Sequence, residues 1–305
     1  MGGRARKVAI AGVLAAAAAV GAGVGVVQVV GASGTPDPVA LEVPIIASAD
    51  AGGPVTRQAV GPVDAATAGD LGELAVPAIQ TGPWADPAPL GDRIVLVGDS
   101  LAQETAGLIQ FLSPGKSVVP KFWGGTAPCD WRDVDLEATP SSVVVITFTG
   151  NSLTDCMSDG AGGHLIDQPL VDAYRHDVGV LVDHARQAGA RVVLIGQPYR
   201  APSFDAELEV DGINAIYREY AAAFPYVSFI DAGAAVETPD GRYTERLPCT
   251  PYDSDCAPDG TTLVRSDGVH FCPIVGQNPC TIWASGAFRF GSEIALAAND
   301  PASFD

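Results

Sequence analysis

Along the C-terminal two-thirds of the chain, the spacing of apolar positions alternates between two patterns. Short apolar runs rich in Val and Ile recur there and predict strands that are buried on both faces. Between these runs, apolar residues recur at three- and four-residue spacing, which predicts amphipathic helices. The predicted strands are 93–97, 117–122, 143–148, 191–195 and 226–230. The predicted helices are 101–112, 168–188, 211–224 and 283–298.

This alternation predicts an α/β domain with a five-stranded parallel sheet covered by helices on both faces. In open sheets of this kind, ligands bind where the strands end at their carboxyl side. Three short polar segments follow predicted strands closely: Asp99-Ser100, Gly124-Gly125 and Gly150-Asn151. We therefore expect these segments to gather at one edge of the sheet.

Residues 231–280 depart from the pattern, with little periodicity and four of the six cysteines. The segment also contains Asp267 and His270, so we expect a long disulfide-braced excursion that carries both residues to the site. Its acidic residues Asp253, Asp255 and Asp259 do not fit the spacing of an EF-hand calcium loop. They predict a solvated acidic loop instead.

The N-terminal segment has the character of an export signal. Residues 1–7 carry three positive charges and residues 8–31 carry none. This arrangement is typical of a secretory signal peptide or of a single membrane anchor, and both choices stay open. Residues 33–88 are rich in Pro, Gly and Ala, which predicts a disordered linker. The expected organisation is therefore leader or anchor 1–32, linker 33–88 and folded domain 89–305, located outside the cell or in its envelope.

The charge of the chain limits its partners. The 305 residues carry a formal net charge of −19, which repels the phosphates of nucleic acids and of anionic lipid surfaces. We therefore expect no nucleic acid partner, and we take the acidity as a contribution to solubility.

The six cysteines favour disulfides over metal binding. All follow the leader and their number is even, as expected in an oxidising compartment. No Cys-x-x-Cys or His-x-x-x-His spacing occurs, so we predict neither a metal nor another cofactor. Six cysteines allow fifteen pairings, and the sequence does not choose among them. The simplest pairs are Cys249–Cys256 and Cys272–Cys280, which leave Cys129 with Cys156.

Ser100, His270 and Asp267 form a set suited to nucleophilic catalysis. A serine hydroxyl is a weak nucleophile until a base takes its proton, and histidine is the usual base near neutral pH. A carboxylate behind the imidazole selects its tautomer and stabilises the imidazolium. Asp267 precedes His270 by three residues, close enough to serve this purpose within one turn of chain.

Four blocks in this order resemble the SGNH hydrolases, also called GDSL-type esterases, over roughly residues 90–298. The blocks are Gly98-Asp99-Ser100-Leu101, Trp123-Gly124-Gly125-Thr126, Thr149-Gly150-Asn151-Ser152 and Asp267-Gly268-Val269-His270. The third departs from the family pattern, because Gly150 directly precedes Asn151. The resemblance implies a flavodoxin-like three-layer α/β/α sandwich and a catalytic triad of Ser100, Asp267 and His270. It also implies an oxyanion hole from Ser100, Gly124 or Gly125, and Asn151.

The resemblance is to exported, actinobacterial-like members of that family, and it implies a serine esterase. The expected substrate is a short acyl ester, including acyl groups on cell-envelope carbohydrate. Two alternatives stay open: an O-acyltransferase with the same site, and a non-catalytic envelope-binding module with the same fold. Arg200 follows the fourth predicted strand, where it could meet an anionic substrate or pair with local acids.

Overall fold

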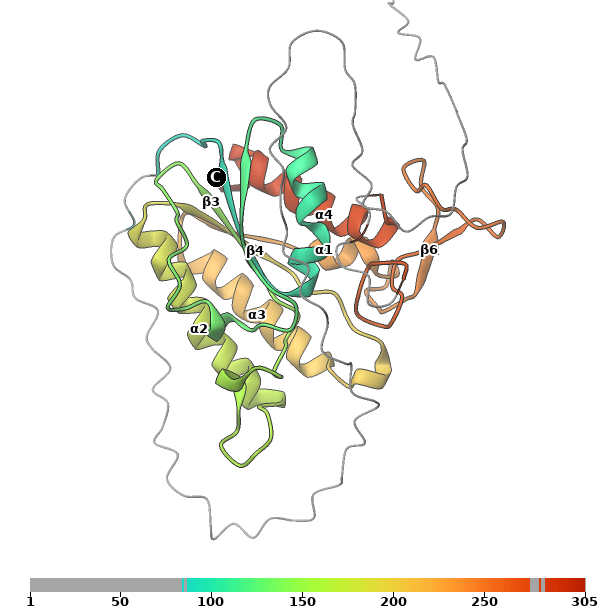
Figure 1. The fold of residues 1–305 in the computed structure, drawn as a ribbon, viewed down its shortest axis with the longest axis horizontal. Coiled ribbons are helices and arrows are strands. Elements are labelled where there is room, and N and C mark those ends of the chain that lie inside the picture. The colour runs from blue at the N-terminus through green and yellow to red at the C-terminus, as the bar shows by residue number, and fades with distance from the viewer. Residues whose placement is uncertain (1–83, 85–86, 275–279, 281–282, 305) are drawn as a thin grey trace, which may run out of the picture. The chain divides into compact units, whose positions relative to one another are not determined.

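The five predicted strands form one parallel sheet (Figure 1). The computed structural model describes residues 84, 87–274, 280 and 283–304. Within them the strand order is β2-β1-β3-β4-β5, and every neighbouring pair is parallel. The expected α/β fold with a flavodoxin-like sheet is thus confirmed. The strands are β1 (Arg93–Gly98), β2 (Ser117–Phe122), β3 (Val143–Thr147), β4 (Arg191–Ile195) and β5 (Val227–Ile230).

Helices cover both faces of this sheet, which produces the expected three layers. Alternate strand residues point to opposite faces, so Ile94 and Leu96 pack in the core under α1 and α4. Val95 and Val97 pack in the other core, under α2 and α3. Figure 1 shows α1 beside α4 and α2 beside α3. The helices are α1 (Ser100–Leu112), α2 (Asp167–Gln187), α3 (Glu207–Ala223) and α4 (Ser285–Asn299).

Helix α3 begins four residues before the expected start at residue 211. The apolar repeat that predicted this helix becomes regular only from Ile213, so the first turn was not recognised. That turn contains Glu207 and Glu209, and carboxylates are favourable near the positive end of a helix dipole. Glu209 also accepts a hydrogen bond from the backbone N–H of Asp167 at 3.2 Å.

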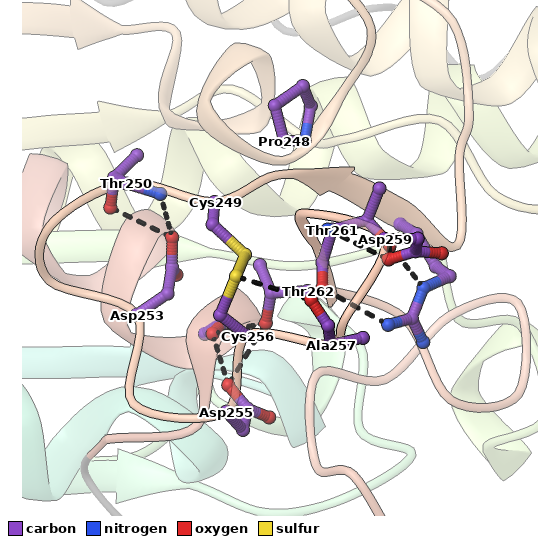
Figure 2. The surroundings of a disulfide bond; sticks show 12 residues. Pro248, Cys249, Thr250, Asp253, Asp255, Cys256, Ala257, Asp259, Thr261 and Thr262 are labelled. Atoms are coloured by element: carbon purple, nitrogen blue, oxygen red, sulfur yellow. Dashed lines mark hydrogen bonds between the residues drawn. A yellow bond between two sulfur atoms is a disulfide. The ribbon is translucent and has the colours of Figure 1, made fainter.

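The segment 231–280 is more regular than expected. It contains an antiparallel hairpin of β6 (Arg246–Pro248) and β7 (Thr261–Leu263). A disulfide joins Cys249 to Cys256 and closes the loop between these strands (Figure 2). Short 3-10 helices also occur in the described residues, one of them within this segment. They are η1 (Pro128–Asp130), η2 (Asp155–Met157), η3 (Pro202–Phe204), η4 (Ala232–Val236) and η5 (Pro301–Phe304).

Of the three acidic residues in this hairpin loop, Asp255 and Asp259 are exposed as the sequence predicted, whereas Asp253 departs from that prediction. Asp253 accepts hydrogen bonds from the backbone N–H and hydroxyl of Thr250 at 2.6 and 2.8 Å (Figure 2). Its side chain has no exposed surface and pairs with Arg289 at 2.7 Å. Asp255 accepts a hydrogen bond from Thr262 at 3.0 Å. These carboxylates therefore hold the loop and helix α4 together.

The last residues of the expected linker contact the domain. Trp84 packs against Phe224 and Tyr226, with ring centroids 5.7 and 6.1 Å apart. The carbonyl of Ala88 accepts a hydrogen bond from Arg191 at 2.6 Å. The predicted leader or anchor and the linker up to residue 83 lie outside the described residues. Among the residues described, no helix is both long and apolar enough to cross a membrane.

Candidate active site

The order of the strands creates a topological switch point where β1 ends. Strands β2 and β3 lie on opposite sides of β1, and such a switch point is the usual ligand site of open α/β sheets. Ser100 follows β1, Gly124 follows β2 and Asn151 follows β3. The carbonyl of Gly98 accepts a hydrogen bond from the Trp123 N–H at 3.3 Å. The segments after β1 and β2 are thereby held side by side.

Ser100 is the first residue of helix α1. Asp99 caps this helix, because its side chain accepts a hydrogen bond from the Leu101 N–H at 3.1 Å. The N–H of a first helical residue has no partner within the helix, and the helix dipole places partial positive charge there. The backbone N–H of Ser100 is therefore suited to receive a developing oxyanion beside its own hydroxyl.

The structure brings Ser100, His270 and Asp267 into one hydrogen-bonded chain. The Nε2 atom of His270 lies 3.0 Å from Ser100 Oγ, although 170 residues separate the two in sequence. The Nδ1 atom of His270 lies 2.8 Å from Asp267 Oδ2. Asp267 Oδ1 accepts hydrogen bonds from the backbone N–H groups of Val269 and His270 at 3.0 and 2.8 Å. This geometry is that of a nucleophile, a base and an orienting carboxylate.

The charges around His270 favour the protonated imidazole. Burial alone would lower its pKa, but the hydrogen bond to Asp267 and the negative charges of Glu104, Asp267 and Asp99 outweigh burial and raise the pKa. For Asp267, burial acts in the opposite direction and would raise the pKa. The hydrogen bonds that Asp267 accepts from His270 and Val269 nevertheless hold its pKa well below the usual range. Asp267 therefore remains ionised while His270 gains and loses a proton.

Of the two candidate glycines, Gly124 lies against the nucleophile. A Cβ atom on Gly124 would lie 3.9 Å from the Cβ of Ser100, whereas one on Gly125 would contact nothing within 4 Å. Gly125 has a φ of +83°, a left-handed conformation that suits glycine in a turn. The N–H of Gly124 donates to Gln103 Oε1 at 3.1 Å. The Gln103 side chain must turn away before this N–H can serve an oxyanion.

The side-chain amide of Asn151 lies at the same edge and is positioned by Asp99. Its Nδ2 atom donates to Asp99 Oδ2 at 2.8 Å and to the carbonyl of Thr126 at 3.3 Å. Asp99 is completely buried and also accepts from the N–H and hydroxyl of Thr149 at 2.5 and 2.7 Å. The longer bond to Thr126 is the one that an oxyanion can replace, because the shorter bond holds the amide in place.

The sequence analysis missed Glu104, which supports the loop that contains His270. Glu104 lies one helical turn after Ser100 and is buried. Its Oε2 atom accepts a hydrogen bond at 2.8 Å from the N–H of Phe271, the residue after His270. Burial raises the pKa of Glu104 to about 7, against the effects of the His270 charge and the Phe271 N–H. The sequence could have indicated Glu104 by its spacing from Ser100, because helix positions four residues apart lie on the same face.

The substitution Glu104→Gln is expected to move the acidic limb of the hydrolysis profile to lower pH. A negative charge at Glu104 favours the imidazolium form of His270, so its removal lowers the pKa of the base. The neutral base required for attack on an ester is then available at lower pH. The measurement is kcat/KM for an aryl acetate across pH 5 to 9.

The glutamine oxygen can still accept a hydrogen bond from the Phe271 N–H. The variant therefore separates the effect of the Glu104 charge from its support of the loop. The matched control is Glu219→Gln, which removes an exposed carboxylate paired with Arg175 on another helix. A lower maximum of kcat/KM with the acidic limb of the pH profile at its wild-type position would show that Glu104 only holds the loop.

Arg265 is a second buried side chain that supports the loop containing His270. It is fully buried, and its Nη1 atom donates to the carbonyl of Val269 at 2.7 Å. Its guanidinium lies 4.6 Å from the centroid of the Phe271 ring, a cation–π contact. Burial lowers the pKa of Arg265 to about 10, although the nearby charges of Glu237 and Glu104 oppose this effect. The residues on both sides of His270 are therefore held by buried side chains: Arg265 binds the carbonyl of Val269, and Glu104 binds the N–H of Phe271.

All six cysteines form disulfides, and two of the bonds lie next to the site. Cys129–Cys156 joins η1, after β2, to η2, after β3. Cys272–Cys280 follows His270 by two residues, and Cys249–Cys256 closes the hairpin loop. Both groups of metal-ligand side chains found among the described residues contain disulfide-bonded cysteines. Those sulfurs are not available as thiolate ligands.

This fold and the hydrogen-bonded chain of Ser100, His270 and Asp267 agree with the resemblance of the four sequence blocks to the SGNH hydrolases, also called GDSL-type esterases. Such a chain of groups is suited to transferring an acyl group to water or to another acceptor. Residues 129–277 match the family DUF459, described as a protein of unknown function. No curated protein matches the chain.

Several solved structures share the fold at low sequence identity. The C-terminal catalytic domain of peptidoglycan O-acetyltransferase A from Streptococcus pneumoniae is 17% identical, with a TM-score of 0.40. That match covers 68% of this chain and 93% of the other. A catalytic mutant of Axe2, an acetylxylan esterase from Geobacillus stearothermophilus, is 14% identical with a TM-score of 0.42. It covers 69% of this chain and 95% of the other.

Proposed function

We propose that this protein is an exported serine esterase that removes short acyl groups from the carbohydrate of a cell envelope. One observation carries the catalytic part of this proposal. The hydroxyl of Ser100 lies 3.0 Å from His270 Nε2, and His270 Nδ1 lies 2.8 Å from the carboxylate of Asp267. A base within hydrogen-bond reach of the nucleophile and oriented by a third group is the arrangement that activates serine.

The reaction follows from the positions of these groups. Ser100 Oγ attacks the ester carbonyl while His270 Nε2 takes its proton, and the carbonyl oxygen becomes an oxyanion. In this proposal the N–H groups of Ser100 and Gly124 and the amide of Asn151 donate to this oxygen after Gln103 releases the Gly124 N–H. His270 then gives its proton to the departing alkoxide, which leaves as the alcohol and forms the acyl-enzyme. Water repeats the sequence, releasing the acid and restoring Ser100.

The cysteines support the exported location. All six are oxidised in three disulfides, and such bonds persist in oxidising compartments but are rare in the cytosol. The uncharged run at residues 8–31 after a basic start adds to this support. The carbohydrate part of the proposal comes from the resemblance to exported SGNH domains that modify envelope polysaccharides.

The test combines a covalent probe with product analysis. The full-length oxidised protein is treated with a fluorophosphonate probe, and the labelled peptide is identified by mass spectrometry. We expect labelling of Ser100 in the wild type and none in Ser100→Ala. The matched control is Ser117→Ala, at the start of β2 and therefore at the opposite edge of the sheet. It should label like the wild type.

Acetate release from O-acetylated envelope polysaccharide, compared with release from lipid esters, then tests the substrate. Added sugar acceptors report transfer by an increase in acetylated acceptor at the expense of free acetate. A protein that neither labels at Ser100 nor releases an acyl group would refute the enzyme reading and favour a binding module.

A further inference from the structure

Arg200 lies between the two loops that build the site. It follows β4, and the next residue, Ala201, donates its N–H to the carbonyl of Gly268 at 2.9 Å. Gly268 directly follows Asp267, so this bond joins the segment of Arg200 to the catalytic loop. On the other side, a Cβ atom on Gly150 would lie 2.9 Å from Arg200 Nη2. Arg200 therefore reaches the backbone immediately before Asn151.

The chain leaves room for this guanidinium at Gly150. That glycine has a φ of +80°, in the left-handed region that other residues rarely adopt. A side chain there would press on Arg200 and on Ile213, whose Cδ1 would lie 3.3 Å from the added Cβ. Because Gly150 directly precedes Asn151, the space at this glycine lets Arg200 lie close to Asn151. The third block departs from the family pattern by this adjacent glycine, and room for Arg200 is a physical role for it.

Two of the three guanidinium nitrogen atoms of Arg200 donate no hydrogen bond within the described residues. Its Nε and Nη2 atoms are buried and have no hydrogen-bond partner among the residues that the structure describes. A buried donor without an acceptor is costly, and a charged one more so. An acceptor supplied by a ligand would remove this cost. The residue as a whole is part-buried, so a ligand that meets its exposed part has to displace neighbouring atoms to reach the buried Nε and Nη2 atoms.

The local acids are already engaged with other donors. Asp99 is near enough for the charge of Arg200 to oppose the rise in its pKa caused by burial. Its oxygens, however, accept from Leu101, Thr149 and Asn151.

The acids near the preceding residue, Tyr199, are engaged as well. Asp211 accepts the Tyr199 hydroxyl, and Glu237 accepts the Tyr199 N–H at 2.6 Å. None of these acids accepts a hydrogen bond from Arg200 Nε or Nη2, although the charge of Arg200 acts on Asp99.

We propose that Arg200 forms an anion subsite beside Asn151 that binds a carboxylate carried by the substrate, an inference that rests on the proposed esterase function. The Nε and Nη2 atoms form one edge of the planar guanidinium, which matches the two oxygens of a carboxylate. The net charge of −19 favours a singly charged carboxylate over a more highly charged phosphate. The carboxylate is on the acyl group, as in a succinyl ester, or on the sugar, as in an acetylated uronic acid.

The test compares matched neutral and anionic esters. For the acyl side, kcat/KM is measured with 4-nitrophenyl acetate and 4-nitrophenyl hemisuccinate. For the sugar side, acetylated methyl glucoside is compared with acetylated methyl glucuronide. The full-length wild type should prefer the anionic member of one pair, and Arg200→Gln should lower that preference by about 10- to 100-fold, as expected for loss of charged hydrogen bonds.

Arg186→Gln is the charge-matched control, because Arg186 lies in the last turn of α2, away from the strand ends that form the site. It should keep the wild-type preference. A wild type that hydrolyses both members of both pairs equally would overturn the subsite. An equal loss for neutral and anionic esters in Arg200→Gln would also overturn it, and would indicate stabilisation of the shared oxyanion.

A binding measurement keeps this inference separate from the proposed catalysis. Calorimetric titration of Ser100→Ala with monomethyl succinate and with methyl glucuronide reports the subsite without turnover. Heat of binding that Arg200→Gln abolishes in the Ser100→Ala background supports the subsite even for a protein that hydrolyses no ester. Absence of binding by both ligands would refute it, whether or not the wild type is an esterase.

Discussion

Replacing His270 with alanine is expected to lower kcat for ester hydrolysis by about 10⁶-fold, the loss typical when the base of a serine triad is removed. Without the imidazole 3.0 Å from Ser100 Oγ, no other base among the residues that the structure describes hydrogen-bonds to the hydroxyl and can take its proton. The leaving alkoxide also loses its proton donor. The measurement is the steady-state rate with an aryl acetate, together with the rate of fluorophosphonate labelling at Ser100.

The matched control for His270→Ala is His176→Ala. His176 also pairs with an aspartate, Asp177, at 2.8 Å, but it lies on α2 and has no serine within its hydrogen bonds. It should retain wild-type activity. Added imidazole should partly restore His270→Ala, because the His270 side chain is 36% exposed and small bases can enter the vacated space. Undiminished activity in His270→Ala would remove His270 from the mechanism.

The substitution Asp267→Asn is expected to lower kcat by about 10⁴-fold while leaving the loop folded. The asparagine oxygen can still accept the backbone N–H groups of Val269 and His270, which Asp267 Oδ1 accepts now. Its NH₂ group then faces His270 Nδ1, which must become the acceptor. The ring proton therefore moves to Nε2, and that nitrogen can no longer take the proton of Ser100.

Loss of the Asp267 charge also removes a cause of the raised His270 pKa, so the remaining activity should depend on pH over a lower range. Asp240→Asn removes an equivalent charge from an exposed turn, where Asp240 pairs with Arg242, and should leave kcat unchanged. Thermal unfolding measured beside the kinetics separates tautomer control from misfolding. A fall in kcat that matches a fraction of unfolded protein would count against the assigned role.

Local sequence patterns were sufficient for the elements of the fold. The β-branched runs of β1 and β3 are so apolar that only a sheet buried on both faces suits them. The helical repeats determined the covering layers in the same way. The pattern was weaker where polar groups start a helix, as at Glu207, and in the hairpin loop, where Asp253 looked solvated but binds Arg289. In both places, partners distant in sequence determine the conformation.

The sequence by itself specified the chemistry: a serine after a strand, a histidine with an aspartate three residues before it, and oxyanion donors between them. Only the tertiary structure decided that His270 reaches Ser100, because that contact depends on how residues 231–280 return to the sheet. It also placed Gly124 closer to Ser100 than Gly125 and revealed the buried Glu104. Spacing along the chain is a local property, whereas burial, hydrogen-bond partners and pKa depend on residues that folding brings together from distant positions.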